Sequence, residues 1–453
     1  MTDKPALLRR LSAIEYFTFG FGTMVGVGWL VLMDDWLGRG GPAGTMLGFF
    51  LGGVLLLPIA RVYGSLVRRI PDAGAEIAYT EGVFPPLLSF ATGWTMVLAY
   101  AIVCPWEAVA IGNLLARIFP SLDSWPLYAL AGKTIYAPRL AVGLALTGVI
   151  TAVNLRGIRP SGLFQDVTTF GLLGAFVVFV SLGLTRGHVA NMMPAFARPG
   201  TAGALLSILL AMQIVPYFMT GFESVVKGSE EARPDFDRRQ FARVMYLAVV
   251  AGSLFYVVIV GAVAFIHPWR DIVSGHVGTE VAFEQAFGSR AIAQLVLAAA
   301  FLSLLKVFNG NFVAATRLML AIGRRGLVHP VLSRVHASHG TPSAAIWLVA
   351  TLTAATAFLG DALLVPITEV GSLAAGVGWL SACVAWLLRV DDEPRWPGYA
   401  GAVVAVGLIA MKVLPFVPGS FTAAEWIALA AWLGLGWVFW SVRAGTRAGA
   451  AAK

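Results

Sequence analysis

The chain has 453 residues, of which 58% are hydrophobic and only 12% are charged. Soluble domains carry about 25% charged residues, so this composition excludes a soluble protein and predicts a polytopic membrane protein. The net charge of +8 could suggest nucleic-acid binding, but most of the 32 Lys and Arg residues fall in loops on one predicted side of the membrane. This is the positive-inside bias of bilayer proteins, and it places both termini in the cytoplasm. No nucleic-acid partner is expected.

The first apolar segment, residues 14–37, contains a stretch that predicts a binding site. Four glycines lie within the nine residues from Gly20 to Gly28, and each costs a helix about 1 kcal/mol relative to alanine. An unwound backbone at membrane depth is tolerated only where it is buried in protein or lines a cavity. The amides freed at Gly26, Val27 and Gly28 would favour a carboxylate or another anion.

Eleven further apolar segments bring the predicted number of membrane-spanning helices to twelve, each near the roughly 20 residues needed to cross a bilayer. They cover about residues 42–66, 87–119, 140–153, 163–184, 204–226, 244–266, 291–322, 343–359, 363–388, 399–414 and 424–442. The sixth span contains Pro216 and Gly221, a second interruption.

The two interrupted helices each open a set of five spans. The sets are repeat one, about residues 14–184, and repeat two, about residues 204–388, with two extra helices at about 399–442. Interruptions at corresponding positions indicate an inverted-repeat transporter whose site lies at the bilayer midplane. Glycines that only let helices pack closely are the alternative interpretation. Either way, residues 1–453 are expected to form a single transmembrane domain.

Glu107 lies well inside the third span, where a charge costs several kcal/mol unless it is paired or hydrated. It could bind a cationic part of a substrate, carry a coupling proton, or be a protonated acid bonded to a neighbouring helix. The six histidines lie in predicted loops without metal-ligand spacing. No catalytic constellation or nucleotide-binding loop is visible, so we expect no enzyme, no metal and no cofactor.

Four motifs, in order, resemble those of the amino acid–polyamine–organocation superfamily. They are Gly22-Thr23-Met24-Val25-Gly26-Val27-Gly28; Pro71-Asp72-Ala73-Gly74-Ala75-Glu76-Ile77-Ala78-Tyr79; Tyr217 to Glu223 followed by Glu230-Glu231; and Asn309 through Thr316-Arg317 and Gly326-Leu327 to Thr341-Pro342. The resemblance implies the all-α LeuT-like fold with broken helices 1 and 6, alternating access, and transport of amino acids or related amines.

The resemblance also implies roles for single positions. The family positions that receive the substrate carboxylate match Val25, Gly26, Val27 and Gly28. Those that receive the amino group match Phe218, Met219 and Thr220. Three side-chain positions that line or gate the site match Tyr217, Glu107 and Asn311.

Two further residues match positions near the family's coupling machinery. Lys306 lies where sodium-coupled relatives of the fold build a cation site between spans one and eight, and some proton-coupled members place a lysine from span five there. A built-in ammonium touching the carbonyls of the first interruption would replace sodium; the alternative is a lysine that snorkels to the cytoplasmic surface. Glu223 matches an acid that ties the broken backbone to its neighbours, and a structural role is favoured over coupling.

The expected protein is therefore a multi-pass secondary transporter of the cytoplasmic (inner) membrane, proton-coupled and sodium-independent. Spans one, two, six and seven would rock against spans three, four, eight and nine. Its partners would be an amino acid or small amine, protons and the lipid bilayer. An amino acid or polyamine exchanger and a transport-inactive membrane sensor are the alternatives.

Overall fold

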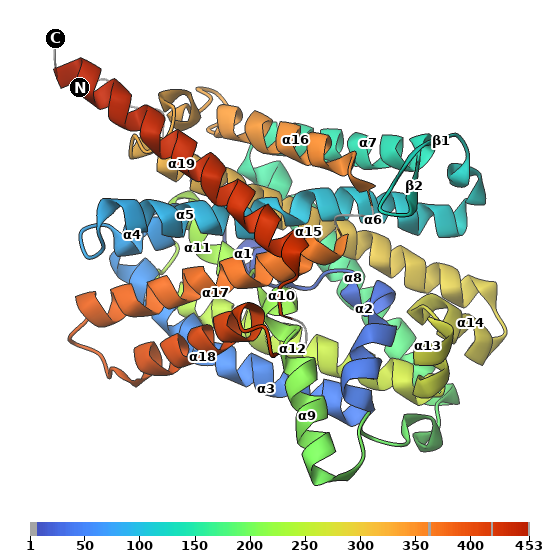
Figure 1. Ribbon diagram of the computed structural model, residues 1–453. Helices are drawn as coiled ribbons and strands as arrows, with labels where there is room; N and C mark the ends of the chain where they lie inside the picture. The colour runs from blue at the N-terminus through green and yellow to red at the C-terminus, as the bar shows by residue number, and fades with distance from the viewer. Residues whose placement is uncertain (1–6, 361–363, 418–419, 452–453) are drawn as a thin grey trace.

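The computed structural model describes residues 7–360, 364–417 and 420–451. Most of its helices lie side by side (Figure 1). Among the described residues, ten helical stretches are long and apolar enough to cross a membrane, and two shorter apolar helices accompany them. The chain is therefore a helical, multi-pass membrane protein. The predicted total of twelve crossings stays a prediction.

The elements up to residue 186 carry the first interruption. They are α1 (Ala13–Met24), α2 (Gly28–Val31), α3 (Met33–Arg69), α4 (Glu76–Thr80), α5 (Pro86–Ala101), α6 (Val103–Ile118), η1 (Pro120–Asp123), β1 (Pro126–Leu130), β2 (Lys133–Tyr136), α7 (Ala137–Leu155) and α8 (Ile158–Arg186).

The elements after residue 186 carry the second interruption. They are η2 (Val189–Met192), α9 (Gly200–Met212), α10 (Val215–Met219), α11 (Ser224–Lys227), η3 (Ser229–Glu231), α12 (Gln240–Ile266), α13 (Trp269–Gly275), α14 (Thr279–Phe287), α15 (Arg290–Arg324), η4 (Pro330–Ser333), α16 (Ser343–Ala357), α17 (Leu364–Arg389), α18 (Trp396–Val413) and α19 (Ala423–Ala451).

Three predicted spans differ in detail from the structure. The third, expected to run unbroken over 87–119, is divided into α5 and α6 at Ile102. Pro105 explains the division, because it has no N–H to donate to the carbonyl four residues earlier. The first and second spans are joined through α3, which bends at Gly41 (φ 66°) just before Pro42.

A β-hairpin between α6 and α7 was not predicted. Its strands pair antiparallel, with Leu130 opposite Lys133. The two turn residues, Ala131 (φ 48°) and Gly132 (φ 76°), both have positive φ, as a type I′ turn requires. An Ala-Gly pair is a weak signal for this turn. The hairpin, α13 and α14 lie at one end of the helix bundle, and α4 lies at the other (Figure 1).

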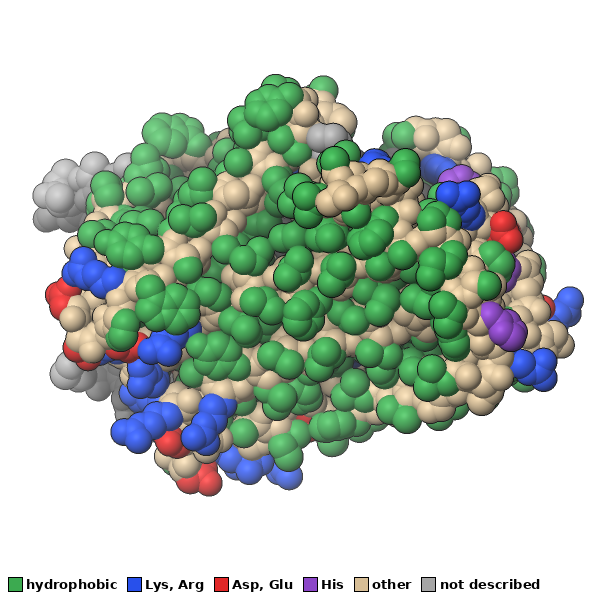
Figure 2. Space-filling view, turned by 90° about the horizontal axis from the view of Figure 1, so that it is seen from below, with side chains coloured by type: hydrophobic (Ala, Val, Ile, Leu, Met, Phe, Trp, Pro, Cys, Tyr) green, Lys and Arg blue, Asp and Glu red, His purple; other side chains and the backbone are tan. Residues whose placement is uncertain are grey.

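The interrupted helix α1 lies at the centre of the molecule, in contact with α8, α12 and α15. Around it, α3 packs along α12 and α9, and α15 packs against α5 and α6. Figure 2 shows a broad hydrophobic surface in the middle of one face, with charged side chains gathered at its two ends. This is the distribution expected of a protein whose middle lies in lipid.

Candidate substrate site

The candidate site lies where the two interrupted helices cross. Val25, between α1 and α2, has an extended backbone (φ −86°, ψ 93°). Gly221, between α10 and α11, has φ 126°, a region that essentially only glycine adopts. A Cβ on Gly221 would lie 2.9 Å from backbone atoms of Thr23 and Met24. The two unwound backbones therefore touch each other directly.

Side chains from other helices bond the carbonyls that the first interruption frees. Lys306 Nζ donates to Gly22 O at 3.1 Å and also to Val25 O; Asn311 Nδ2 donates to Thr23 O at 3.5 Å, Tyr256 OH to Met24 O at 3.2 Å, and Ser303 Oγ to Val25 O at 3.0 Å. Four successive carbonyls thus regain the partners that the broken helix gave up. An unwound helix is tolerated at membrane depth when its freed carbonyls find hydrogen-bond donors in this way.

Lys306, on α15, is fully buried. Its ammonium lies against the carbonyls of Gly22 and Val25 and 5.6 Å from the centre of the Phe21 ring. The side chain therefore points into the protein and does not reach a membrane surface. Its use as a substitute for a sodium ion stays a prediction.

Glu107, on α6, is 2% exposed, and its Oε2 has no hydrogen-bond partner among the described residues. A buried polar atom without a partner is costly, so it marks a place where a ligand or a proton would be stabilised. The carboxylate lines a small central cavity of about 30 Å³, together with Met24, Gly26, Val27, Gly28, Tyr217, Phe218, Thr220 and Asn311.

Most of the predicted binding residues thus meet around one cavity, but two do not line it. Val25 turns its carbonyl to Lys306 and Ser303, and Met219 is buried against α12, where its sulfur would lie 3.7 Å from a Cβ on Gly252. The binding roles predicted for these two positions stay predictions. A cavity of about 30 Å³ is far smaller than the roughly 300–1,000 Å³ of small-molecule sites, so the site is contracted.

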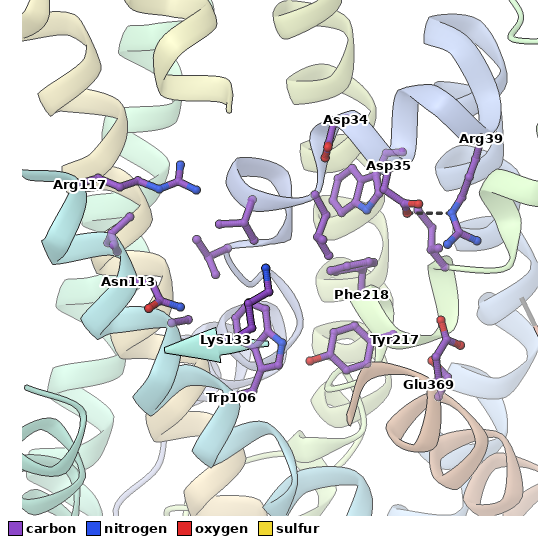
Figure 3. Close-up of a pocket in the computed structure, with 18 of the residues that line it drawn as sticks. Asp34, Asp35, Arg39, Trp106, Asn113, Arg117, Lys133, Tyr217, Phe218 and Glu369 are labelled. Carbon is purple, nitrogen blue, oxygen red and sulfur yellow. Dashed lines mark hydrogen bonds and ion pairs between the residues drawn. The ribbon is translucent and has the colours of Figure 1, made fainter. Parts of the chain in front are cut away.

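A much larger cavity of about 560 Å³ adjoins the central one and shares Val27, Trp106, Tyr217 and Phe218 with it. We call this larger cavity the vestibule. In Figure 3, Tyr217 and Phe218 lie between Trp106 and Lys133 on one side and Glu369 on the other. Phe218 also packs on Gly28 so closely that a Cβ there would collide with the ring. The Phe218 ring therefore lies at the boundary that the two cavities share.

Charged side chains around the vestibule form pairs that the sequence did not predict. Asp35 accepts from Arg39 at 2.8 Å, Asp34 lies 2.8 Å from Nδ1 of His276, and Glu369 pairs with Lys412. Lys412 and Glu369 lie within predicted spans, and this location was the sequence signal that could have identified them.

The opposite end of the bundle is closed by ion pairs. Arg317 donates to both carboxylate oxygens of Glu231, at 3.0 and 3.1 Å, and both side chains are fully buried. Arg324 pairs with Glu230 at 2.6 Å, and Arg325 pairs with Asp72 at 2.8 Å. We call the end formed by these three ion pairs the closed end; its residues are Asp72, Glu230, Glu231, Arg317, Arg324 and Arg325. The pairs join loops and helices from three of the four sequence motifs.

Glu223 lies between the central cavity and the closed end. It is fully buried, and its Oε2 accepts a hydrogen bond from the amide of Gly221 at 3.1 Å. The carboxylate thus holds the unwound backbone, which is the structural role that the sequence favours. Its Oε1 makes no hydrogen bond within the described chain.

Comparison with known proteins identifies the family. The sequence pattern of a family described as amino acid permease matches residues 11–440. The chain is 25% identical over 442 residues to a methylthioribose transporter of Bacillus subtilis, covering 95% of this chain and 92% of that protein. It is 25% identical over 436 residues to the branched-chain amino acid permease BcaP of the same organism, covering 91% and 88%. It is 23% identical over 394 residues to the amino-acid permease RocE, also of B. subtilis, covering 84% and 81%. With its apolar helices and its interrupted helix crossing, this chain belongs to the amino acid permease family of the amino acid–polyamine–organocation superfamily, whose members are transporters and not enzymes.

Proposed function

We propose that this permease moves an amino acid or a related small organic amine by alternating access, coupled to protons and independent of sodium. The observation that carries the proposal is Oε2 of Glu107, which has no hydrogen-bond partner in the described part of the chain. It lines the same cavity as the unwound backbone of both interrupted helices. A buried acid beside freed amides supplies one acceptor for an amine and several donors for a carboxylate.

In this proposal, the substrate carboxylate docks at the amides of Val27 and Gly28. The first amides of a helix have no carbonyl partner within that helix, so they remain available to an anion. The amino group lies toward Thr220 and Glu107. Because Phe218 lies at the boundary between the vestibule and the central cavity, its ring must move before a substrate can enter.

Sodium independence follows from Lys306. Its ammonium already contacts the carbonyls of Gly22 and Val25, and a second cation on the same oxygens would be repelled. The protein would lie in the inner membrane with twelve spanning helices. Its vestibule would face outward and its closed end would face the cytoplasm. Import by proton symport is favoured, and exchange of one amine for another is the alternative.

A thermal-stability screen of the purified protein tests the substrate class. The ligands are neutral, cationic and anionic amino acids, amines, polyamines and methylthioribose, each with sodium and with potassium. A ligand at 100 times its dissociation constant adds about 2.7 kcal/mol to a native state that alone binds it. We expect stabilisation by an amino acid or amine that is equal in both salts.

The Glu107→Gln variant separates the two roles of the carboxylate in the same screen. Loss of stabilisation by a cationic ligand would assign Glu107 to the substrate's side chain. Retained stabilisation by a neutral amino acid, with uptake that no longer depends on pH, would assign it to the proton. Stabilisation by methylthioribose alone, or only in sodium, would contradict the proposal.

A further inference from the structure

A second buried charged cluster lies beside the closed end, apart from the central cavity. It contains Lys227, the last residue of α11, Glu76, the first residue of α4, and Glu223. All three side chains are fully buried. Lys227 Nζ donates to Glu76 Oε1 at 2.5 Å, and the hydroxyl of Tyr63 donates to the same oxygen at 2.7 Å. We call Glu76, Lys227 and Glu223 the inner triad.

The inner triad carries two acids and one base. Within the described chain, the ion pair of Lys227 is to Glu76, and Glu223 has none. One oxygen of each acid, Glu76 Oε2 and Glu223 Oε1, also makes no hydrogen bond there. With both acids ionised, the cluster would hold one uncompensated buried negative charge, which is expensive. One bound proton removes that charge and turns an unpaired acceptor into a donor.

The groups around the triad do not supply the missing positive charge. The ammonium of Lys227 lies 5.5 Å from the Tyr63 ring centre and 5.1 Å from that of Tyr100. Tyr79, on α4, also faces Glu76. The neighbouring buried cation, Arg317 on α15, is engaged by both oxygens of Glu231. Among the described residues, the titratable groups facing the two acids are therefore these tyrosines and Lys227.

Lys227 has two alternative partners. Glu223 precedes it by four residues, which is one helical turn, and an acid four residues before a lysine is the favourable order for a helical ion pair. Glu76, by contrast, belongs to α4, which packs on α5 and α17. The observed pair therefore ties the interrupted sixth helix to a different part of the bundle, whereas a pair with Glu223 would be confined to one segment.

We propose that the inner triad binds a single proton, held by Glu223 while the closed end is shut, and that loss of this proton opens the closed end. Ionised Glu223 draws Lys227 away from Glu76, the tie to α4 is broken, and the proton leaves to cytoplasmic water. Glu76 then becomes hydrated as the end opens. The inference rests on the proposed proton-coupled transport and assigns its proton to a site other than Glu107.

The test is uptake of labelled substrate into proteoliposomes, with and without an inward proton gradient, for wild type, Glu223→Gln and Glu107→Gln. Glutamine keeps the shape of the acid but cannot release a proton. Because the closed end would then stay shut, we expect Glu223→Gln to lose both accumulation driven by the gradient and exchange of labelled for unlabelled substrate, and to keep stabilisation by the substrate in the thermal screen. Glu81→Gln, which removes an exposed acid on the same side, should keep the wild-type response to pH.

The outcomes separate the inference from the proposed function. Gradient-driven accumulation by Glu223→Gln at the wild-type level would overturn the inference, as would loss of gradient dependence in Glu107→Gln alone. Absence of uptake and exchange in wild type would overturn the proposed function itself. If Glu223→Gln does not fold, Glu223→Asp keeps an acid of shorter reach; a shift of its pH midpoint for uptake supports the inference, and an unchanged midpoint contradicts it.

Discussion

At the scale of single residues, the structure shows how a permease can hold an unwound helix with a lysine. The ammonium of Lys306 satisfies two backbone carbonyls at once, those of Gly22 and Val25. It also lies near the buried acid Glu107, whose ionised form would carry a charge of the opposite sign. Removing Lys306 would leave Gly22 O without this donor and Glu107 without a nearby positive charge.

The Lys306→Ala substitution should therefore abolish transport. It removes the donor from Gly22 O and leaves Ser303 as the donor to Val25 O, so the first interruption loses part of its support. Uptake into proteoliposomes and thermal unfolding of the purified variant measure the two effects separately. Lys133→Ala, which removes an exposed lysine of the vestibule, is the control and should unfold like wild type. A Lys306→Ala protein that transports at the wild-type rate would rule out a role for the ammonium.

Glu107→Gln is expected to abolish uptake. The amide cannot carry the charge that would attract a cationic group, and it cannot exchange a proton. The measurement is initial uptake rate across a range of external pH. Wild-type uptake with a wild-type pH profile would leave Glu107 as a structural acid and would remove the basis of the substrate orientation proposed above.

At the scale of elements, the interruptions and the apolar segments were predictable, because glycine content and hydropathy are local properties of the chain. The interruption after Met24 lies within the glycine stretch, and Pro105 divides the third span for a reason that can be read from one residue. The hairpin around Ala131 and Gly132 was not predictable, since its turn lacks the usual Asn-Gly or Asp-Gly pair.

Ion pairs between segments far apart in the chain could also not be predicted from the sequence. The acid at position 76 belongs to a motif that was identified, but nothing local indicates that it meets Lys227, 151 positions later. The same holds for Glu369 and Lys412, whose place beside the vestibule depends on the packing of α17 against α18. Resemblance to a family supplied the substrate-site positions, whereas these pairs had to be seen in three dimensions.

The contact between the interrupted helices gives a prediction about stability. Gly221→Ala should destabilise the protein by about 2 kcal/mol or more, because a side chain at φ 126° is strained and its Cβ would press on the backbone of Thr23 and Met24. Thermal unfolding of the purified variant in detergent measures the loss. The matched control is Gly148→Ala on α7, where a Cβ meets no atom within 4 Å. Equal stability of the two variants would contradict the backbone contact at the crossing.

At the scale of the whole molecule, the two ends of the bundle differ in a way that alternating access requires. One end opens into a vestibule of about 560 Å³, and the other is shut by the fully buried pair of Arg317 and Glu231. Breaking a buried ion pair by neutralising one partner costs about 3–5 kcal/mol. A two-state equilibrium passes from 1:99 to 99:1 with about 5.5 kcal/mol. The Glu231 pair alone could therefore supply most, but not all, of the free energy that such a shift requires.

The Glu231→Gln substitution should thus shift the protein away from the state with an open vestibule. A cysteine introduced by Leu32→Cys, on the vestibule wall, reports this state through its rate of labelling by a membrane-impermeant maleimide. The background is low because both native cysteines, Cys104 and Cys383, are buried. Labelling should be slower when Leu32→Cys is combined with Glu231→Gln than when it is combined with Glu81→Gln. Glu81→Gln is the control because the Glu81 side chain is 61% exposed and its ion pair with Arg325 therefore contributes little stability. Equal labelling rates in the two backgrounds would show that the pair of Glu231 and Arg317 does not hold the closed end shut, and the balance between the two states would then have to rest on the remaining pairs at that end.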